Sequence, residues 1–243
     1  MIFPQVLQPA ILVRRYKRFL ADVELQDGTR ITLHCPNTGS MRNCQTPSSR
    51  VWYTNSANKL RKYPCTWQIV ENGFGQIVGV NTGLANQLVV EAIQTGRIRE
   101  LEGYEKLETE VSYGEQGSRI DILLRNTARN PSASDKCYVE IKNVSLAVDR
   151  RQALFPDAVT LRGHKHLQEL MLMRAKGHRA VLLFCVQISA VEAVAPADDI
   201  DPEYRRLLRL AAASGVEVLA YRADFDLAKS TISLNTGISV ELY

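Results

Sequence analysis

The order of the secondary-structure patterns after residue 85 constrains the fold of this chain more than any other feature of the sequence. Helical periodicity alternates there with short strand patterns, and three strands follow one another before the second helix. Strands joined by short turns pair antiparallel, whereas strands joined through a helix become parallel neighbours. We therefore expect a mixed sheet that is covered by helices. The expected elements are, in order, helix 86–103, strands 106–115, 118–126 and 138–146, helix 160–177, strand 179–188, helix 202–215, strand 216–225 and a final hairpin over 231–242 that turns at Asn235-Thr236-Gly237.

The first 85 residues predict a different kind of domain, a small β-barrel. Residues 11–35 have the pattern of two strands joined at the Asp27-Gly28 turn, which is a strong hairpin signal. Five short strands in fewer than ninety residues are typical of a barrel of the OB type. The sequence thus predicts a mixed α/β protein with an OB-like domain over 1–85 and a second domain over 86–243. The three further strand patterns of the barrel cover 50–56, 63–73 and 75–82.

Basic charge is concentrated in the first of these domains. Through residue 85 the chain has ten Lys and Arg against four Asp and Glu, whereas the remainder has twenty against twenty-two. This asymmetry favours a polyanion such as DNA, with RNA as an alternative, as the partner of the barrel. Cations mixed with aromatic side chains suit phosphate neutralisation and base stacking, although charge that guards a strand edge is the other interpretation. The two clusters are Arg14, Arg15, Tyr16, Lys17 and Arg18, and Lys59, Arg61 and Lys62 ahead of Tyr63 and Trp67.

The composition predicts a cytoplasmic protein. No window approaches 18 uncharged apolar residues, and the first basic cluster follows the apolar N-terminal segment, the reverse of a secretory signal. The five cysteines form no CxxC pair and no zinc-ligand spacing, which fits a reducing compartment. We expect no membrane partner. The edges of a small barrel and of a mixed sheet would permit a dimer, but no pattern specifies one.

Two of the predicted strands carry charges in otherwise apolar runs. Glu140 and Lys142 are two residues apart in YVEIKNVSL, so their side chains share one face, and Asp121 stands in the preceding strand RIDILL. Apolar strands rarely bury unpaired charges. Carboxylates on neighbouring strands can hold one or two Mg²⁺ or Mn²⁺ ions, and a nearby lysine can orient or deprotonate the attacking water.

This arrangement and the order of the elements are similar to those of PD-(D/E)xK nucleases. We therefore predict Asp121, Glu140 and Lys142 as catalytic residues, with Asp121, Glu140 and Glu91 as metal ligands and Glu110 as the second choice for the third ligand. The triplet (D/E)-x-K alone is weak evidence for such a site, because a chain with 26 acids and nine lysines contains about one such triplet by chance. An ion pair of Lys142 with either carboxylate on an exposed sheet face is the alternative.

The helix after the lysine strand and two loops add further candidates. Arg162, Lys165 and Gln168 can share one helix face and contact phosphate. His164 and His166 cannot both point inward, and we expect solvent exposure or capping for them and not metal ligation. Asp157 is expected in a turn or cap. The loop tips 37–39 and 81–83 suit either phosphate contacts or Asx-turns.

Motifs along most of the chain resemble the sugar fermentation stimulation protein A family. They are CPNTGSM, RKYPCTWQIV, VGVNTGLANQLVVEAI, SRIDILL, YVEIKNVSL, FPDAVTLRGHKHLQELM, RAVLLF and PADDIDPEY. The resemblance implies an OB-like and a nuclease-like domain, DNA binding without sequence preference, and regulation of sugar (maltose) utilisation genes. It places the nuclease-like motif on Asp121, Glu140 and Lys142, with arginine and isoleucine before Asp121 where the motif's name has proline.

Two functions therefore remain open at the level of sequence. One is a DNA-binding regulator of transcription whose acidic cluster is a structural relic. The other is a Mg²⁺- or Mn²⁺-dependent nuclease that acts on DNA or RNA, because binding alone does not call for carboxylates that face a phosphate backbone.

Overall fold

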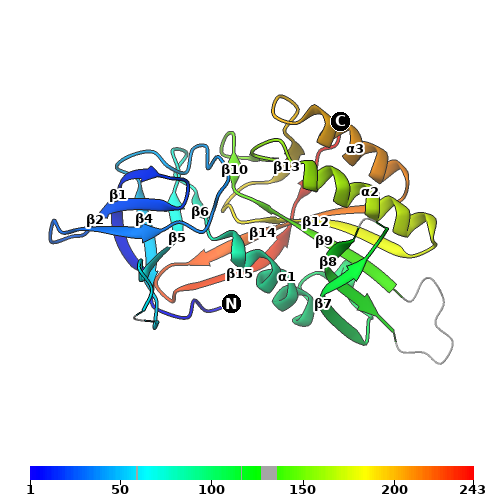
Figure 1. Cartoon of the computed structure of the whole chain (residues 1–243), viewed down its shortest axis with the longest axis horizontal. Helices are drawn as coiled ribbons and strands as arrows, with labels where there is room; N and C mark the ends of the chain where they lie inside the picture. Colours follow the sequence, from blue (N-terminus) through cyan, green and yellow to red (C-terminus); the bar gives the residue numbers. More distant parts are fainter. Residues whose placement is uncertain (59, 116, 127–135) are drawn as a thin grey trace.

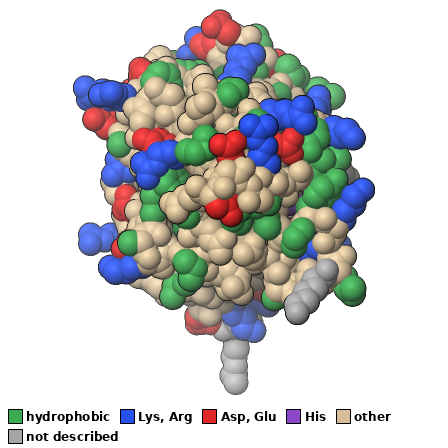
Figure 2. Space-filling model, turned by 90° about the vertical axis from the view of Figure 1, so that its left-hand side faces the viewer, with side chains coloured by type: hydrophobic (Ala, Val, Ile, Leu, Met, Phe, Trp, Pro, Cys, Tyr) green, Lys and Arg blue, Asp and Glu red, His purple; other side chains and the backbone are tan. Residues whose placement is uncertain are grey.

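The N-terminal part of the computed structural model, which describes residues 1–58, 60–115, 117–126 and 136–243, is a closed β-barrel (Figure 1). Its strands lie in the order β3-β2-β1-β4-β5-β6, and β3 also pairs with β5 to close the barrel. Figure 2 views this end of the molecule and shows separate Lys and Arg side chains around its rim, with Asp and Glu between them. The strands are β1 (Gln8–Tyr16), β2 (Leu20–Glu24), β3 (Arg30–His34), β4 (Arg50–Asn55), β5 (Cys65–Glu71) and β6 (Ile77–Gly79).

Residues 11–35 contain a turn that the sequence did not reveal. The predicted Asp27-Gly28 turn joins β2 to β3, with Gly28 at a φ of 82°. However, β1 and β2 are separated by another turn, in which Lys17 and Arg18 have φ values of 51° and 63°. Residues with a Cβ seldom adopt positive φ values, so nothing in the identities of Lys17 and Arg18 predicts a turn. The prediction of a single strand here was therefore wrong.

The C-terminal part is built on the predicted mixed sheet, in the order β15-β14-β12-β9-β8-β7. The first three strands in the chain form an antiparallel meander, and β9, β12 and β14 are parallel because helices connect them. The continuous apolar run of β12 is explained by its central place, where both faces are covered. The strands are β7 (Lys106–Tyr113), β8 (Ser118–Arg125), β9 (Lys136–Val144), β12 (Arg179–Val186), β14 (Glu217–Asp226) and β15 (Thr231–Gly237).

Helices cover both faces of this sheet. They are α1 (Ala85–Gln94), α2 (Leu161–Ala175) and α3 (Pro202–Ala213). Leu167 of α2 and Leu207 of α3 share a hydrophobic cluster with Leu182 of β12, whereas Leu88 of α1 packs in the cluster that contains Leu183. Successive residues of β12 thus face opposite layers, with α2 and α3 on one side and α1 on the other (Figure 1). Within the described ranges, no helix is long and apolar enough to cross a membrane.

Two of the predicted elements have different limits in the structure. The helix predicted over 86–103 ends at Gln94, and the chain turns at Gly96 with a φ of 66° before a short 3-10 helix, η2 (Arg99–Leu101). The predicted hairpin over 231–242 is wrong, because β15 runs through Asn235 to Gly237 while paired with β14. The hairpin forms instead between β14 and β15.

A small second sheet, which the sequence did not predict, lies beside the junction of the barrel and the α/β part. The last strand, β16, leaves β15 to join this sheet through parallel pairing with β13. Its two-to-four-residue strands are too short to give a periodic signal. They are β10 (Leu146–Ala147), β11 (Gln152–Phe155), β13 (Ala193–Pro196) and β16 (Ser239–Val240).

The barrel and the α/β part are joined by more than the short 3-10 helix η1 (Thr82–Leu84) that links β6 to α1. The N-terminal segment bridges to β15 at Ile2 and Thr231, and Val78 of β6 bridges to Ile188. One hydrophobic cluster includes side chains of both parts. The domain limits 1–85 and 86–243 stay a prediction.

Candidate active site

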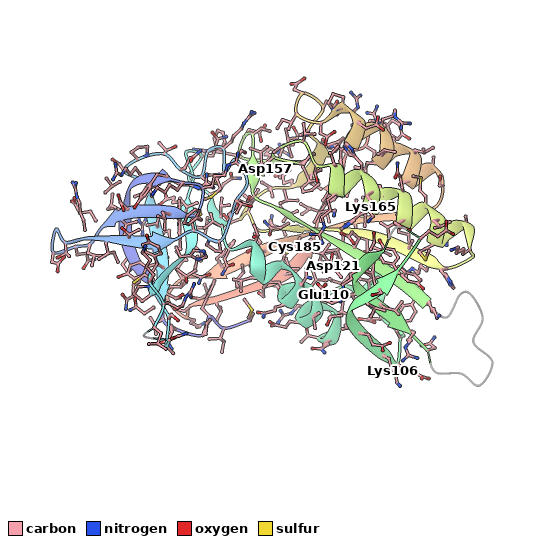
Figure 3. The ribbon with its side chains drawn as sticks, viewed as in Figure 1. Lys106, Glu110, Asp121, Asp157, Lys165 and Cys185 are labelled. Carbon is pink, nitrogen blue, oxygen red and sulfur yellow. The ribbon has the colours of Figure 1, made fainter. Side chains whose placement is uncertain are left out.

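Three acidic side chains form a row across β7, β8 and β9. Glu110 and Asp121 lie between the residue pairs Thr109–Ile122 and Val111–Ile120, and Glu110, with a φ of 55°, interrupts the β7–β8 ladder. Asp121 and Glu140 come one residue beyond the last β8–β9 pair, Ile122 with Val139. Glu110 and Asp121 lie near α1 in Figure 3. We call these three residues the acidic row. Like charges on neighbouring strands repel each other, so the row requires compensation by cations or hydrogen-bond donors.

Asp121 is held at the point where β8 and β9 separate. The Ile141 backbone N–H donates to Asp121 Oδ2 at 2.7 Å, and the Asn86 side chain of α1 donates to Asp121 Oδ1 at 3.0 Å. The same Asn86 amide lies 3.5 Å from Glu110 Oε1. Burial, and then the neighbouring charge of Glu140, raise the pKa of Asp121 above its ordinary value. The charge of Glu140 on β9 thus acts on Asp121 on β8.

Glu140 is almost completely buried, with 2% of its side chain exposed. Its Oε1 accepts a hydrogen bond from Lys142 Nζ at 2.7 Å and another from the His166 ring. Burial would raise the pKa of Glu140, but the His166 hydrogen bond and the Lys142 charge outweigh it, so this pKa is lowered. Glu140 Oε2 is buried and has no hydrogen-bond partner among the described residues. An ionised carboxylate with one unsatisfied oxygen is a candidate cation ligand.

His166 belongs to this site, contrary to the expectation of solvent exposure. Its side chain, on α2, is 6% exposed, and its Nε2 lies 3.3 Å from Arg162 Nε. Arg162 and His166 are four residues apart and share one helix face, which is a signal that sequence reasoning could have used. Arg162 and Gln168 are exposed, and Lys165 is half-buried on α2 (Figure 3).

His164 has a different role from His166. Its Nε2 lies 2.9 Å from both carboxylate oxygens of Asp201, the residue that caps α3. It therefore links α2 to α3 and is not placed as a metal ligand.

The residue that α1 directs to the carboxylates is Asn86, not Glu91. Glu91 accepts from the N-terminal ammonium group of Met1, with a shortest distance of 2.7 Å, and lies 3.6 Å from Arg97. The side chain of Glu91 thus pairs with Met1 and Arg97 and does not take the place of a metal ligand that was predicted for it. Nothing in the sequence distinguishes Asn86, because its contact with Asp121 depends on how α1 packs on the sheet.

The donor set of this site fits a hydrated divalent cation. No group of three or more His, Cys, Asp or Glu side chains in the described part of the chain could hold a metal ion by itself. Mg²⁺, however, keeps several waters and is commonly bound through one or two carboxylates plus substrate phosphates. Asp121, half-buried, and Glu140, with its unpartnered Oε2, supply two such carboxylates beside the Lys142 ammonium group.

The first predicted nucleic-acid cluster contains an arginine in an ion pair, an arginine that holds a loop, and two exposed cations in a turn. Arg14 pairs with Asp22 at 2.9 Å and lies over the Tyr16 ring. Arg15 donates to backbone carbonyls of residues 18, 37 and 39, so its guanidinium holds the loop after β3 in place. Lys17 and Arg18 are exposed in the turn between β1 and β2, and we call these two residues the basic turn.

The second predicted cluster is only partly available to a ligand. Lys59 lies outside the described residues, Arg61 and Lys62 are exposed, and Lys62 Nζ lies 5.6 Å from the centre of the Tyr63 ring. Trp67 is completely buried, and its indole N–H donates to the Ile69 carbonyl. The expectation that Trp67 stacks on bases was therefore wrong, because its side chain fills the barrel core.

The two loop tips form Asx-turns. Asn37 Oδ1 accepts from the Gly39 N–H at 2.8 Å, and Asn81 Oδ1 accepts from the Gly83 N–H at 3.2 Å. Asp157 accepts from the Ser40 N–H at 2.9 Å and thereby ties the barrel loop to the α/β part. These polar groups organise the junction of the two parts.

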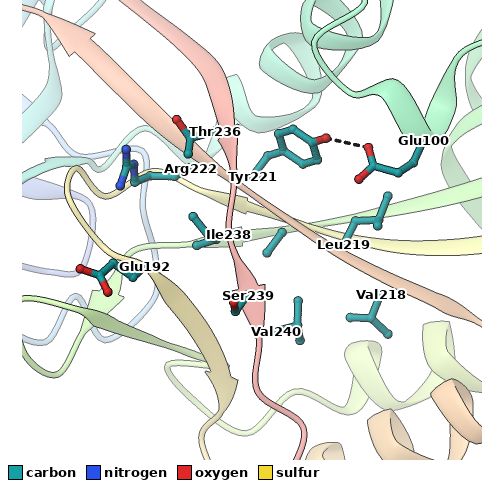
Figure 4. Close-up of a pocket in the computed structure, with 12 residues that line it drawn as sticks. Glu100, Glu192, Val218, Leu219, Tyr221, Arg222, Thr236, Ile238, Ser239 and Val240 are labelled. Carbon is teal, nitrogen blue, oxygen red and sulfur yellow. Dashed lines mark hydrogen bonds between the residues drawn. The ribbon is translucent and has the colours of Figure 1, made fainter.

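A cavity of about 590 Å³ lies along β14 and the end of β15 (Figure 4). Two of its polar side chains already have protein partners: the Tyr221 hydroxyl donates to Glu100 at 2.6 Å, and Arg222 Nη1 donates to the Val191 carbonyl at 3.0 Å. None of the predicted site residues lines this cavity.

Comparison with known proteins agrees with this architecture. Residues 13–80 match the SfsA N-terminal OB domain, and residues 83–229 match the sugar fermentation stimulation protein RE domain. Sugar fermentation stimulation protein homologs of Shewanella sp. (strain MR-4) and Shewanella baltica (strain OS195) are each 55% identical over 224 residues, which is 92% of this chain and 93% of each relative. The solved structure of Pyrococcus furiosus SfsA in complex with Ca²⁺ is 26% identical and covers 99% of both chains, with a TM-score of 0.83. The chain belongs to the sugar fermentation stimulation protein family.

Proposed function

We propose that this protein binds DNA without reading its sequence and hydrolyses phosphodiester bonds with the help of a divalent cation. The observation that supports the proposal is the place of Asp121 and Glu140 on the paired strands β8 and β9, with Lys142 against Glu140. A buried, unpartnered carboxylate oxygen in this position is costly to the fold, and a cation would compensate it.

Each residue of the site has a distinct chemical task in this proposal. Asp121 and Glu140 would hold Mg²⁺ or Mn²⁺, which supplies Lewis-acid polarisation of the phosphoryl oxygen and a more acidic bound water. Lys142 would orient the attacking water and offset the charge that develops on the phosphate. The relative from Pyrococcus furiosus was solved with Ca²⁺, a hard cation that prefers oxygen ligands as Mg²⁺ does, which supports a divalent-cation site in this chain.

The barrel would supply affinity. The exposed basic turn and the cations Arg61 and Lys62 can neutralise phosphates without contacting base edges. The same mode of binding suits single-stranded RNA, so RNA is the alternative substrate. We place the protein in the cytoplasm, where its five free cysteines would stay reduced.

A DNA-binding regulator of sugar (maltose) utilisation genes is the second candidate. It is favoured by the contacts of Glu140 Oε1, which Lys142 and His166 already occupy as in a structural ion pair. In that case the Lys142 ammonium group would serve only to neutralise a buried carboxylate.

A cleavage assay separates the two candidates. Labelled single- and double-stranded DNA and RNA are incubated with the wild type, Lys142→Ala and the control Lys229→Ala, with Mg²⁺, with Mn²⁺ or with a chelator. Lys229 is 79% exposed and pairs only locally with Asp226. We expect cation-dependent cleavage by the wild type and the control, and a loss of at least about a hundredfold in Lys142→Ala. Cleavage that is absent from all three proteins, or equal in all three, would overturn the hydrolytic function and leave the regulator.

A further inference from the structure

The contacts of His166 suit the tautomer in which Nδ1 carries the proton. Arg162 Nε lies 3.3 Å from His166 Nε2, and a guanidinium group can only donate hydrogen bonds. In the tautomer with the proton on Nδ1, Nε2 can accept from Arg162 while Nδ1 donates to Glu140 Oε1.

His166 and Lys142 use the same oxygen of Glu140. Lys142 Nζ donates to Oε1 at 2.7 Å, and its approach to His166 Nδ1 at 3.1 Å is then only a packing contact, because both groups are donors. All three side chains are nearly enclosed, with 2%, 6% and 11% exposed for Glu140, His166 and Lys142. Two donors on one oxygen leave Oε2 as the unpartnered one.

We propose that His166 is a positioning residue that holds Glu140 by Oε1 and thereby presents Oε2 to the divalent cation. The inference rests on the function proposed above. Carboxylates that bind metals are themselves oriented by hydrogen bonds from an outer shell of residues, and loss of such a partner weakens metal binding. A glutamate without this partner has more side-chain freedom to lose when a cation binds.

The same contact would let Lys142 leave its 2.7 Å pair with Glu140 during the reaction. Without His166, Lys142 would be the only donor to Glu140 and would stay in the ion pair. With His166 in place, the ammonium group can turn toward a bound water or a phosphate while Glu140 keeps its orientation. His166 thus separates the task of positioning the ligand from the task of acting on the water.

Two substitutions at this position distinguish positioning from packing. In His166→Asn, the side-chain amide can place an N–H near the position of Nδ1 and still donate to Glu140. In His166→Leu, the volume is retained but the donor is lost. His164→Asn is the matched control on the same helix, because His164 contacts Asp201 and not Glu140.

The test measures Mn²⁺ affinity by calorimetry without nucleic acid, together with the melting temperature and the ¹⁵N NMR signals of the His166 ring in the wild type. We expect an Nδ1–H signal, a loss of about ten- to a hundredfold in Mn²⁺ affinity in His166→Leu, and near wild-type affinity in His166→Asn and the control. An Nε2–H tautomer, or equal Mn²⁺ affinity in His166→Leu and the wild type, would overturn the inference while the hydrolytic function stands. If the wild type binds no Mn²⁺ and cleaves nothing, the proposed function fails first and the inference with it.

Discussion

The basic turn of the barrel and the acidic row of the sheet are both concentrations of charge, but they are maintained in opposite ways. Lys17 and Arg18 are exposed, and a local turn with two positive φ values places them. Asp121 and Glu140 are held by contacts from α1, α2 and the strand backbone. Burial raises the pKa of Asp121, whereas against burial the His166 hydrogen bond and the Lys142 charge lower the pKa of Glu140. The first arrangement suits a salt-dependent grip on a polyanion, whereas the second suits chemistry at one point.

The largest expected effect is a loss of cleavage activity when a residue of the acidic row is replaced. Asp121→Asn retains the size of the side chain but removes a ligand charge, so we expect cleavage to fall on the order of a thousandfold. DNA affinity measured without divalent cation should not change, because the proposed function assigns this affinity to the barrel. Asp224→Asn, an exposed carboxylate on β14, is the control. A parallel loss of binding in Asp121→Asn would show that the two regions are not separate.

The next effect is on stability. Glu140→Ala leaves Lys142, 11% exposed, without its 2.7 Å partner, and we expect the free energy of unfolding to fall by about 3 kcal/mol. Glu115→Ala removes a carboxylate from an exposed pair with Lys176 and should change it by less than about 1 kcal/mol. Urea unfolding of both variants provides the measurement. Similar losses of unfolding free energy in the two variants would mean that the buried pair of Glu140 contributes no more stability than an exposed pair.

A third prediction concerns the basic turn. The double substitution Lys17→Asn with Arg18→Gly removes two charges but suits the positive φ values better, since Asn and Gly adopt them readily. We expect DNA affinity to fall roughly tenfold. The slope of log affinity against log salt concentration should become shallower by up to about two. The melting temperature should hold or rise. Lys176→Asn with Arg206→Gln, two exposed cations of the α/β part, is the control for net charge. An unchanged salt slope would remove the basic turn from the DNA interface.

The smallest effect is a pH-dependent difference in stability between Asp121→Asn and the wild type. The pKa of Asp121 is raised in the fold by burial and by Glu140, so its ionisation opposes folding. The wild type should therefore lose folding stability as the pH rises through the folded pKa and Asp121 ionises. The amide of the variant does not titrate, so the stability of the variant lacks this pH dependence. We expect the variant to be more stable at neutral pH in the absence of metal, with the difference shrinking below the ordinary pKa of aspartate. Denaturant unfolding at a series of pH values measures it, and a constant difference would contradict the assigned cause.

Much of the fold could be predicted because it depends on local patterns. The apolar run of β12, the hairpin signal at Gly28 and the order of helices and strands are all properties of neighbouring residues. The basic turn was missed for the corresponding reason: Lys17 and Arg18 adopt a glycine-like backbone without a glycine. Trp67 was misplaced because an aromatic residue beside basic ones has the same local pattern in a binding surface and in a barrel core.

The sequence by itself determined which strand residues are candidates for the site, because a two-residue period places Glu140 and Lys142 on one face and a carboxylate stands out in an apolar strand. Only the tertiary structure decided their partners. Asn86 took the place expected of Glu91, and His166 proved to be buried, because contacts between helices and a sheet depend on packing over long separations in the chain. Charge and periodicity are local properties, whereas the orientation of a carboxylate is set by every element that packs around it.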